Sequence, residues 1–166
     1  MYLLRIICVT LIPFAAFAAS ESRLNDVAER GRHVMPFDLE ATTHIFTKTP
    51  TGGIQQVRVK KPDNSHQIKL IRSHLQKIAA EFRQGDFSNP AKIHGDDMPG
   101  LQVLSQAQPG QLTINYKDLN DGAELDYITQ NPELQKAVHD LFDAQLSDHA
   151  RHAQQGPSMH ELHHPQ

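Results

Sequence analysis

The chain contains almost no cysteine: Cys8 is the only one among 166 residues. Cys8 lies in an N-terminal segment in which Arg5 precedes a short apolar run, and Ala16-Phe17-Ala18 forms the small-x-small pattern of a cleavage site. These features are typical of a signal peptide, so we expect cleavage after Ala18 and a mature chain of 148 residues (166 − 18) without a thiol. A thiol-free chain excludes disulfides, iron–sulfur clusters, thiolate zinc sites and cysteine nucleophiles.

Long hydrophobic runs and an excess of positive charge are also missing. The apolar run of the leader, at residues 6–17, is too short to span a bilayer. Without Arg5 the chain has 15 Lys and Arg against 19 Asp and Glu, a net charge of −4 with neutral histidines, and aromatic residues are only 6% of the full chain. Nucleic-acid binding requires a basic surface and often stacking aromatics. The leader predicts a periplasmic or secreted protein. The short apolar run and the lack of a basic surface predict that this protein has no membrane span and no nucleic-acid partner.

Several motifs of enzymes and cofactor-binding proteins are absent as well. The sequence has no Gly-x-Ser-x-Gly elbow, phosphate loop, dinucleotide fingerprint, His-Glu-x-x-His helix or Cys-x-x-Cys-His haem attachment. We therefore expect no nucleotide cofactor. Any nucleophile would have to be a serine or threonine without a recognisable motif around it.

The hydrophobic pattern of the first half predicts a hairpin followed by a helix. Apolar and polar residues alternate over residues 37–46, with Leu39 and Ile45 on the apolar face, as in a half-buried strand. A Thr-Pro-Thr-Gly-Gly turn at 49–53 leads into a returning strand. A helix follows that ends at Gly85. Its apolar stripe consists of Ile68, Ile71, Leu75, Ile78, Ala79 and Phe82.

The second half repeats this order. Two alternating segments flank the turn at 120–122, which reads Asn-Asp-Gly and predicts a second hairpin. A long helix over residues 131–152 follows, with Asn131 as its cap and Pro132 at its first position. Its apolar stripe consists of Leu134, Val138, Leu141, Phe142 and Leu146.

These elements predict an α+β fold. We expect a four-stranded antiparallel sheet built from the two β-hairpins, with the two long helices on one face, in the order ββαββα. The expected organisation is a signal peptide at 1–18, an N-terminal arm at 19–36, a single α+β domain at 37–155 and a disordered, histidine-rich tail at 156–166.

Histidine is unusually abundant, with eleven residues in the chain. Imidazoles suit copper(II), zinc and nickel, and an imidazole together with a thioether suits copper in its reduced state. His33, Met35 and His44 bring these ligand types together in a short stretch. The alternative is that His44 is an exposed strand residue and that Met35 packs against the edge of the sheet.

A second group of candidates lies between the two hairpins. The loop 94–98 carries His94, Met98 and two aspartates, but its spacing does not match a calcium-binding loop. A turn with helix caps explains the same residues without a ligand. A metal site here needs a further ligand from another element, such as His74 or His139.

The last helix carries histidines beside carboxylates. His139 and Asp143 lie four residues apart and border the apolar stripe, so they are neighbours on the helix surface. Such a pair can hold a metal, transfer protons or form an ordinary ion pair. His149 and His152 lie near the C-terminal end, where a protonated histidine gains from the helix dipole and needs no metal.

Five stretches resemble a group of small exported bacterial proteins, some of which carry an aspartate carbamoyltransferase name. The chain itself is too short for such a catalytic chain and lacks the Ser-Thr-Arg-Thr phosphate-binding segment. The resemblance implies no mechanism, but it marks His33, His44, His74, His94 and His149 as the histidines within the shared stretches. The stretches are R-H-V-M-P-F-D-L-E-A-T-T-H-I-F at 32–46, I-R-S-H-L at 71–75, G-D-F at 85–87, I-H-G-D-D-M-P-G-L at 93–101 and F-D-A-Q-L-S-D-H at 142–149.

The leading hypothesis is a periplasmic binding or accessory protein that holds a transition metal, copper first and zinc second. One alternative is a small hydrolase or lyase that uses His139 and Asp143 for proton transfer. The other is a structural module that binds a periplasmic protein partner without a metal; histidines more than ~12 Å apart would favour it, because metal–nitrogen bonds are only about 2 Å long. The candidate metal ligands are His33, Met35, His44, His74, His94, Met98 and His139, with Asp143 as an orienting partner.

Overall fold

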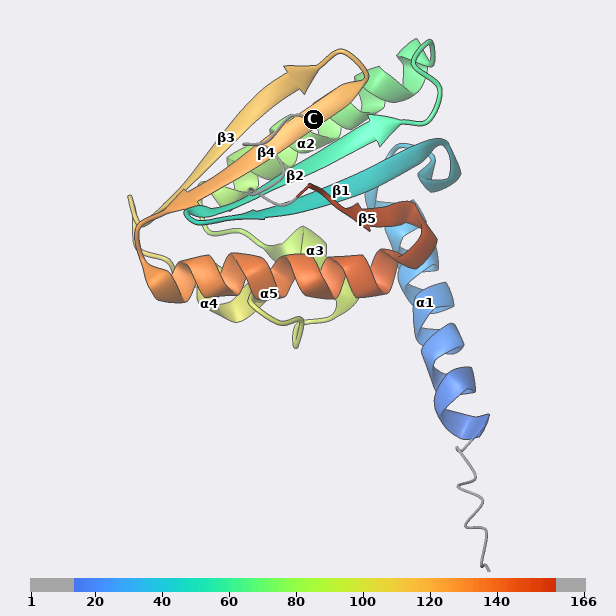
Figure 1. Cartoon of the computed structure of the whole chain (residues 1–166), viewed down its shortest axis with the longest axis horizontal. Coiled ribbons are helices and arrows are strands. Elements are labelled where there is room, and N and C mark those ends of the chain that lie inside the picture. The colour runs from blue at the N-terminus through green and yellow to red at the C-terminus, as the bar shows by residue number, and fades with distance from the viewer. Residues whose placement is uncertain (1–13, 158–166) are drawn as a thin grey trace, which may run out of the picture.

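A computed structural model of the chain describes residues 14–157, with side chains from Glu21 to Pro157. The elements are arranged as a sheet with helices packed along it (Figure 1). In chain order they are α1 (Phe14–Val34), η1 (Leu39–Ala41), β1 (Thr42–Thr49), β2 (Gly52–Val59), α2 (Ser65–Phe82), α3 (Ser88–His94), α4 (Leu101–Ser105), β3 (Leu112–Leu119), β4 (Gly122–Thr129), α5 (Pro132–His149), η2 (Ala150–His152) and β5 (Ala153–Gln155).

The two hairpins predicted from the sequence form most of the sheet. β1 pairs with β2, β2 with β4 and β4 with β3, all antiparallel, and the order across the sheet is β3-β4-β2-β1-β5. At the start of β2, Gly52 has a φ of 137°, a conformation that side chains rarely allow. The carbonyl of Tyr127 occupies the place where a side chain of residue 52 would stand, so this turn requires glycine.

A fifth strand corrects the four-stranded, purely antiparallel sheet that the sequence predicts. The fold is α+β as expected, but β5 pairs parallel to β1, with Ala153 opposite His44. Ala150, at a φ of 43°, and the short helix η2 lead the chain from α5 back to the sheet edge. Because three residues cannot show a periodic pattern, the ββαββα order misses β5, and it also misses the short helices α3 and α4.

Helices α2 and α5 pack on the same face of the sheet, where aromatic rings join the layers. The ring centroid of Phe142 in α5 lies 5.1 Å from that of Phe46 in β1 and 5.4 Å from that of Tyr127 in β4. The ring of Phe82 in α2 lies 6.2 Å from the same tyrosine. The predicted stripes of both helices are buried, except that Leu146 is only partly buried. These contacts form one continuous core.

Strand β1 faces this core with the alternation opposite to the predicted one. Helix η1 interrupts the alternating segment, and β1 begins only at Thr42. His44 and Phe46 are therefore buried, at 3% and 1% exposed, whereas Ile45 is partly buried on the other face. A shift of one residue in a strand moves every side chain to the opposite face. The one-residue difference from the predicted alternation therefore places His44 inside the protein.

The segment predicted as an N-terminal arm, 19–36, belongs mostly to helix α1. This helix contacts α3 and α5 and stands beyond the C-terminal end of α5 (Figure 1). Val27 is fully buried, and Arg30 Nε donates to the carbonyl oxygen of Ile93 at 2.7 Å. Few apolar residues of α1 contact the rest of the protein. The apolar stripe of this helix is therefore too narrow to predict from the sequence that α1 packs against α3 and α5.

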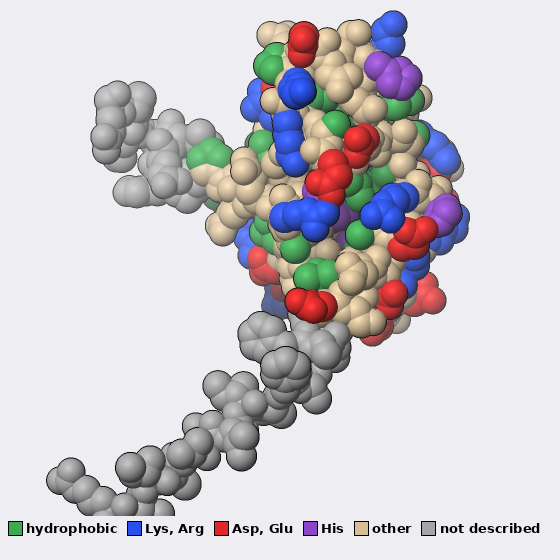
Figure 2. All heavy atoms as spheres, turned by 90° about the vertical axis from the view of Figure 1, so that its right-hand side faces the viewer, with side chains coloured by type: hydrophobic (Ala, Val, Ile, Leu, Met, Phe, Trp, Pro, Cys, Tyr) green, Lys and Arg blue, Asp and Glu red, His purple; other side chains and the backbone are tan. Residues whose placement is uncertain are grey.

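The predicted signal peptide and tail fall largely on residues outside those described, 1–13 and 158–166. Between residues 14 and 157, none of the helices combines the length and the hydrophobicity needed to cross a bilayer. On the face shown in Figure 2, acidic and basic side chains are interspersed.

Candidate functional site

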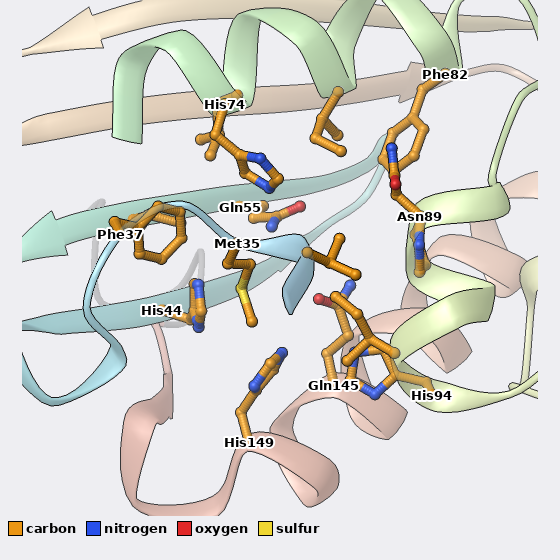
Figure 3. Close-up of a pocket in the computed structure, with 16 residues that line it drawn as sticks. Met35, Phe37, His44, Gln55, His74, Phe82, Asn89, His94, Gln145 and His149 are labelled. Carbon is orange, nitrogen blue, oxygen red and sulfur yellow. The ribbon is translucent and has the colours of Figure 1, made fainter. Parts of the chain in front are cut away.

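A small cavity lies between the sheet, helices α2, α3 and α5, and the chain just after α1. Its volume is about 50 Å³. This volume holds an ion or a few waters, whereas sites for organic ligands usually measure roughly 300–1,000 Å³. Figure 3 shows the side chains around it. The polar residues of the lining are His44, Gln55, His74, Asn89, His94, Gln145 and His149, and the thioether of Met35 joins them.

His44 of β1 and His149 of α5 face each other at one end of the cavity. Their ring centroids are 4.7 Å apart, and both residues are buried, at 3% and 5% exposed. His44 Nδ1 has no hydrogen-bond partner among the described residues. In Figure 3 the side chain of Met35 extends toward the two rings. Two imidazoles and a thioether from three separate segments thus line the same cavity.

His94, at the end of α3, contacts this pair and is itself held by a carboxylate. Its ring packs edge-to-face against His149, with a centroid distance of 5.0 Å. Its Nδ1–H donates to Asp148 Oδ2 at 2.9 Å. Arg23 of α1 donates to both oxygens of the same carboxylate, at 3.1 and 3.0 Å. The Arg23–Asp148 pair therefore fixes the tautomer and the orientation of His94, as outer carboxylates do for metal-binding histidines.

His74 lines the cavity from α2, but an aromatic ring lies next to both it and His44. Phe37 packs edge-on against His74, with a centroid distance of 5.6 Å, and against His44 at 5.8 Å. Ring contacts join His149 to His44 and to His94, whereas the ring contact of His74 is with Phe37.

Burial keeps the imidazoles around the cavity neutral. It lowers the pKa of His44 to about 3, with smaller effects from neighbouring histidines. Burial likewise lowers the pKa of His149 well below 6.5 and that of His74 to about 4. For His94, burial lowers the pKa despite the opposing effect of Asp148. A neutral ring keeps a nitrogen lone pair, which is the form that binds metal ions.

Two other predicted ligands lie away from the cavity. His33 is on the exposed side of α1, and its Nε2 lies 3.4 Å from a carboxylate oxygen of Glu29. Met98 is buried in the hydrophobic core and does not line the cavity. The predicted loop 94–98 therefore contributes only His94 to the site.

The pair proposed for proton transfer also has other partners. His139 Nε2–H donates to the carbonyl oxygens of Thr49 and Gly52, at 3.1 and 2.9 Å. Asp143 lies 2.5 Å from the Lys48 ammonium group. Both residues thus attach α5 to the first hairpin, and neither lines the cavity.

From the sequence, the helix dipole accounts for His149, and Gln145 and Asp148 are not among the predicted site residues. A signal for all three was present, because they continue the buried stripe from Leu141 at helical spacing, and all three are buried. The stripe of α5 is therefore apolar at its start and polar at its end. Extending the helical period past Leu141 would have placed these polar residues toward the interior.

Within residues 21–157, no three histidine, cysteine, aspartate or glutamate side chains are arranged to hold a metal ion. A metal site on the described residues must therefore combine fewer imidazoles with a ligand of another kind. The thioether beside His44 and His149 is a ligand of that kind.

Comparison of the chain with protein-family models, with curated proteins and with solved structures gives no match. The geometry of the cavity is therefore the basis for assigning a function.

Proposed function

We propose that the protein is an exported metal-binding protein that holds one copper(I) ion between His44, His149 and Met35. The observation that carries this proposal is the convergence of two buried, neutral imidazoles and a thioether on a cavity of about 50 Å³. A buried polar nitrogen without a partner costs free energy. His44 Nδ1 is such an atom among the described residues, and the cavity beside it has room for an ion as its partner.

Copper(I) fits these ligands better than zinc does. Thioether sulfur is a soft ligand that favours copper(I). Structural zinc sites are almost always tetrahedral and draw four ligands from cysteine, histidine, aspartate and glutamate. The described residues hold no group of three such side chains around one point. Zinc is therefore the second choice.

Elemental analysis of purified, untagged protein after exposure to Cu(I) tests the proposal. His160, His163 and His164 should be replaced by asparagine in every sample, because histidines outside the site bind transition metals on their own. We expect one copper ion per chain and a higher unfolding temperature, since an ion that binds only the folded state stabilises it. A protein without bound copper or zinc, and without any thermal shift, would contradict the proposal.

Met35→Leu separates copper from zinc. Leucine fills a similar volume but offers no sulfur, so the affinity for Cu(I) should fall by roughly tenfold or more while the affinity for Zn(II) changes little. Competition with a coloured chelator measures both affinities. The exposed residue His33 supplies the control: His33→Asn should leave both unchanged. An unchanged Cu(I) affinity in Met35→Leu would remove the thioether from the site.

A proton-transfer site is the second candidate, and the hydrogen bond between His94 and Asp148 favours it. A neutral His94 can accept a proton, as a hydrolase or lyase would require of its base. Turnover of small esters by metal-free protein, lost in His94→Asn, would support this function. Wild-type protein without such turnover would leave the copper site as the better assignment.

A further inference from the structure

A wide groove lies beside the cavity and shares part of its wall. The groove has a volume of about 1,140 Å³ and runs between α1, η1, the start of α2 and η2. Met35, Phe37 and His149 line both the cavity and the groove. These three side chains therefore separate the proposed copper site from the groove, and two of them are proposed ligands. An ion that enters from the groove would first meet Met35 and His149, which are two of its proposed ligands.

A further histidine, His152, lies in this groove. Its side chain is only 9% exposed, and its Nε2 is 3.4 Å from Glu40 Oε1. Its Nδ1 is buried and has no hydrogen-bond partner in the part of the chain that the structure describes. The neighbouring Arg151 also pairs with Glu40, but this pair is exposed on both sides, and such pairs contribute little and exchange easily. His152 thus has one ring nitrogen without a partner and a carboxylate beside the other nitrogen. Neither His152 nor Glu40 lines the cavity.

The fold places His152 next to the copper ligands. Helix η2 carries it three residues after His149, and the next residue, Ala153, pairs with His44 across β1 and β5. A partly hidden imidazole beside a carboxylate can take up an ion from the surface without holding it permanently.

We propose that His152, assisted by Glu40, is the uptake ligand that receives copper(I) in the groove and passes it to Met35 and His149. This inference rests on the proposed copper site. The transfer is a ligand exchange: the bond from copper to His152 breaks as bonds to the thioether and the inner imidazoles form. The oxidation state of the ion does not change, and the ligand that delivered it leaves into solvent.

The rate of copper uptake tests this role separately from copper holding. Cu(I) is supplied to the full-length protein, with the three tail histidines replaced, as its bicinchoninate complex, whose loss of colour reports transfer. His152→Asn should slow uptake by about tenfold while still binding one ion at the end, because it removes an outer partner and not a final ligand. Glu40→Gln should slow it by roughly threefold, since the carboxylate attracts the cation. His66→Asn is the matched control, because His66 is exposed and lines the same groove; it should load at the wild-type rate.

The outcomes distinguish this inference from the copper site itself. If wild-type protein takes up no Cu(I), the proposed function fails and this inference fails with it. If wild-type protein binds one ion and His152→Asn loads equally fast, only the uptake role is wrong. A folded His152→Asn protein that binds no ion would also overturn it, because His152 would then be a holding ligand. If His152→Asn does not fold, Glu40→Gln decides, and a wild-type rate in that variant overturns the inference.

Discussion

Replacing either His44 or His149 by asparagine should abolish tight binding of copper(I). Each variant leaves one imidazole and the Met35 thioether, and an amide is a poor ligand for this soft ion. We expect the dissociation constant for Cu(I) to rise by roughly 100-fold or more, which corresponds to about 2.7 kcal/mol. Chelator competition measures the affinity, and far-ultraviolet circular dichroism checks that each variant is folded.

The control for these variants comes from the same cavity. His74 also lines it, but Phe37 packs against the rings of both His74 and His44. His74→Asn therefore removes a partly buried imidazole from the same cavity without removing a proposed ligand, and it should bind copper as the wild type does. A folded His149→Asn protein that still binds Cu(I) at wild-type affinity would show that the ion lies elsewhere.

Acid should destabilise the metal-free protein because its inner histidines are buried without charge. The pKa of His44 is about 3 in the folded protein and 6.5 in the unfolded chain. Between these values the unfolded chain binds a proton that the folded protein does not. Stability is therefore complete above about pH 6.5 and falls as the pH drops toward 3. Between pH 7 and pH 5, His44 alone should cost about 2 kcal/mol of unfolding free energy.

Urea unfolding at pH 7 and pH 5 measures this effect. His149 should add to it, since burial lowers its pKa in the same direction. Other groups also titrate in this range, so the comparison that matters is between wild type and His44→Asn, which should lose less stability on acidification. His66 is exposed, so the stability of His66→Asn should depend on pH as that of the wild type does. An equal loss in His44→Asn and wild type would mean that His44 is not buried as a neutral ring.

Local patterns predicted the elements that depend on neighbouring residues. The stripe from Ile68 to Phe82 and the turn residues of both hairpins fix α2 and four strands, because period and turn chemistry are properties of short segments. Strand β5 and the docking of α1 were not predictable in the same way. They depend on contacts with distant parts of the chain, such as Ala153 with His44 and Arg30 with Ile93.

The candidate site shows the same division. The sequence predicts Met35, His44, His74 and His94 as ligands, and the structure places all four around one cavity. It did not predict that His149 completes the group, because the sequence offered a sufficient alternative in the helix dipole. Which imidazole rings come together depends on the angle at which α5 crosses β1. The hydrophobic pattern of the sequence does not determine that angle.

The pairing of Asp148 with Arg23 illustrates the limit most clearly. The two residues lie 125 positions apart, yet they form a two-pronged ion pair that holds His94 beside His149. In the sequence, Asp148 lies four residues before His152, a spacing that favours a local pair on one helix. The structure directs that carboxylate instead to α1 and α3, and so connects three elements around the site.

X-ray absorption at the copper edge of the Cu(I)-loaded protein tests the central claim most directly, because it identifies the atoms bound to the ion. If His44, His149 and Met35 hold the copper, the first shell contains two nitrogen atoms and one sulfur atom, and the sulfur disappears in Met35→Leu. A first shell made only of nitrogen and oxygen in the wild-type protein would contradict the account.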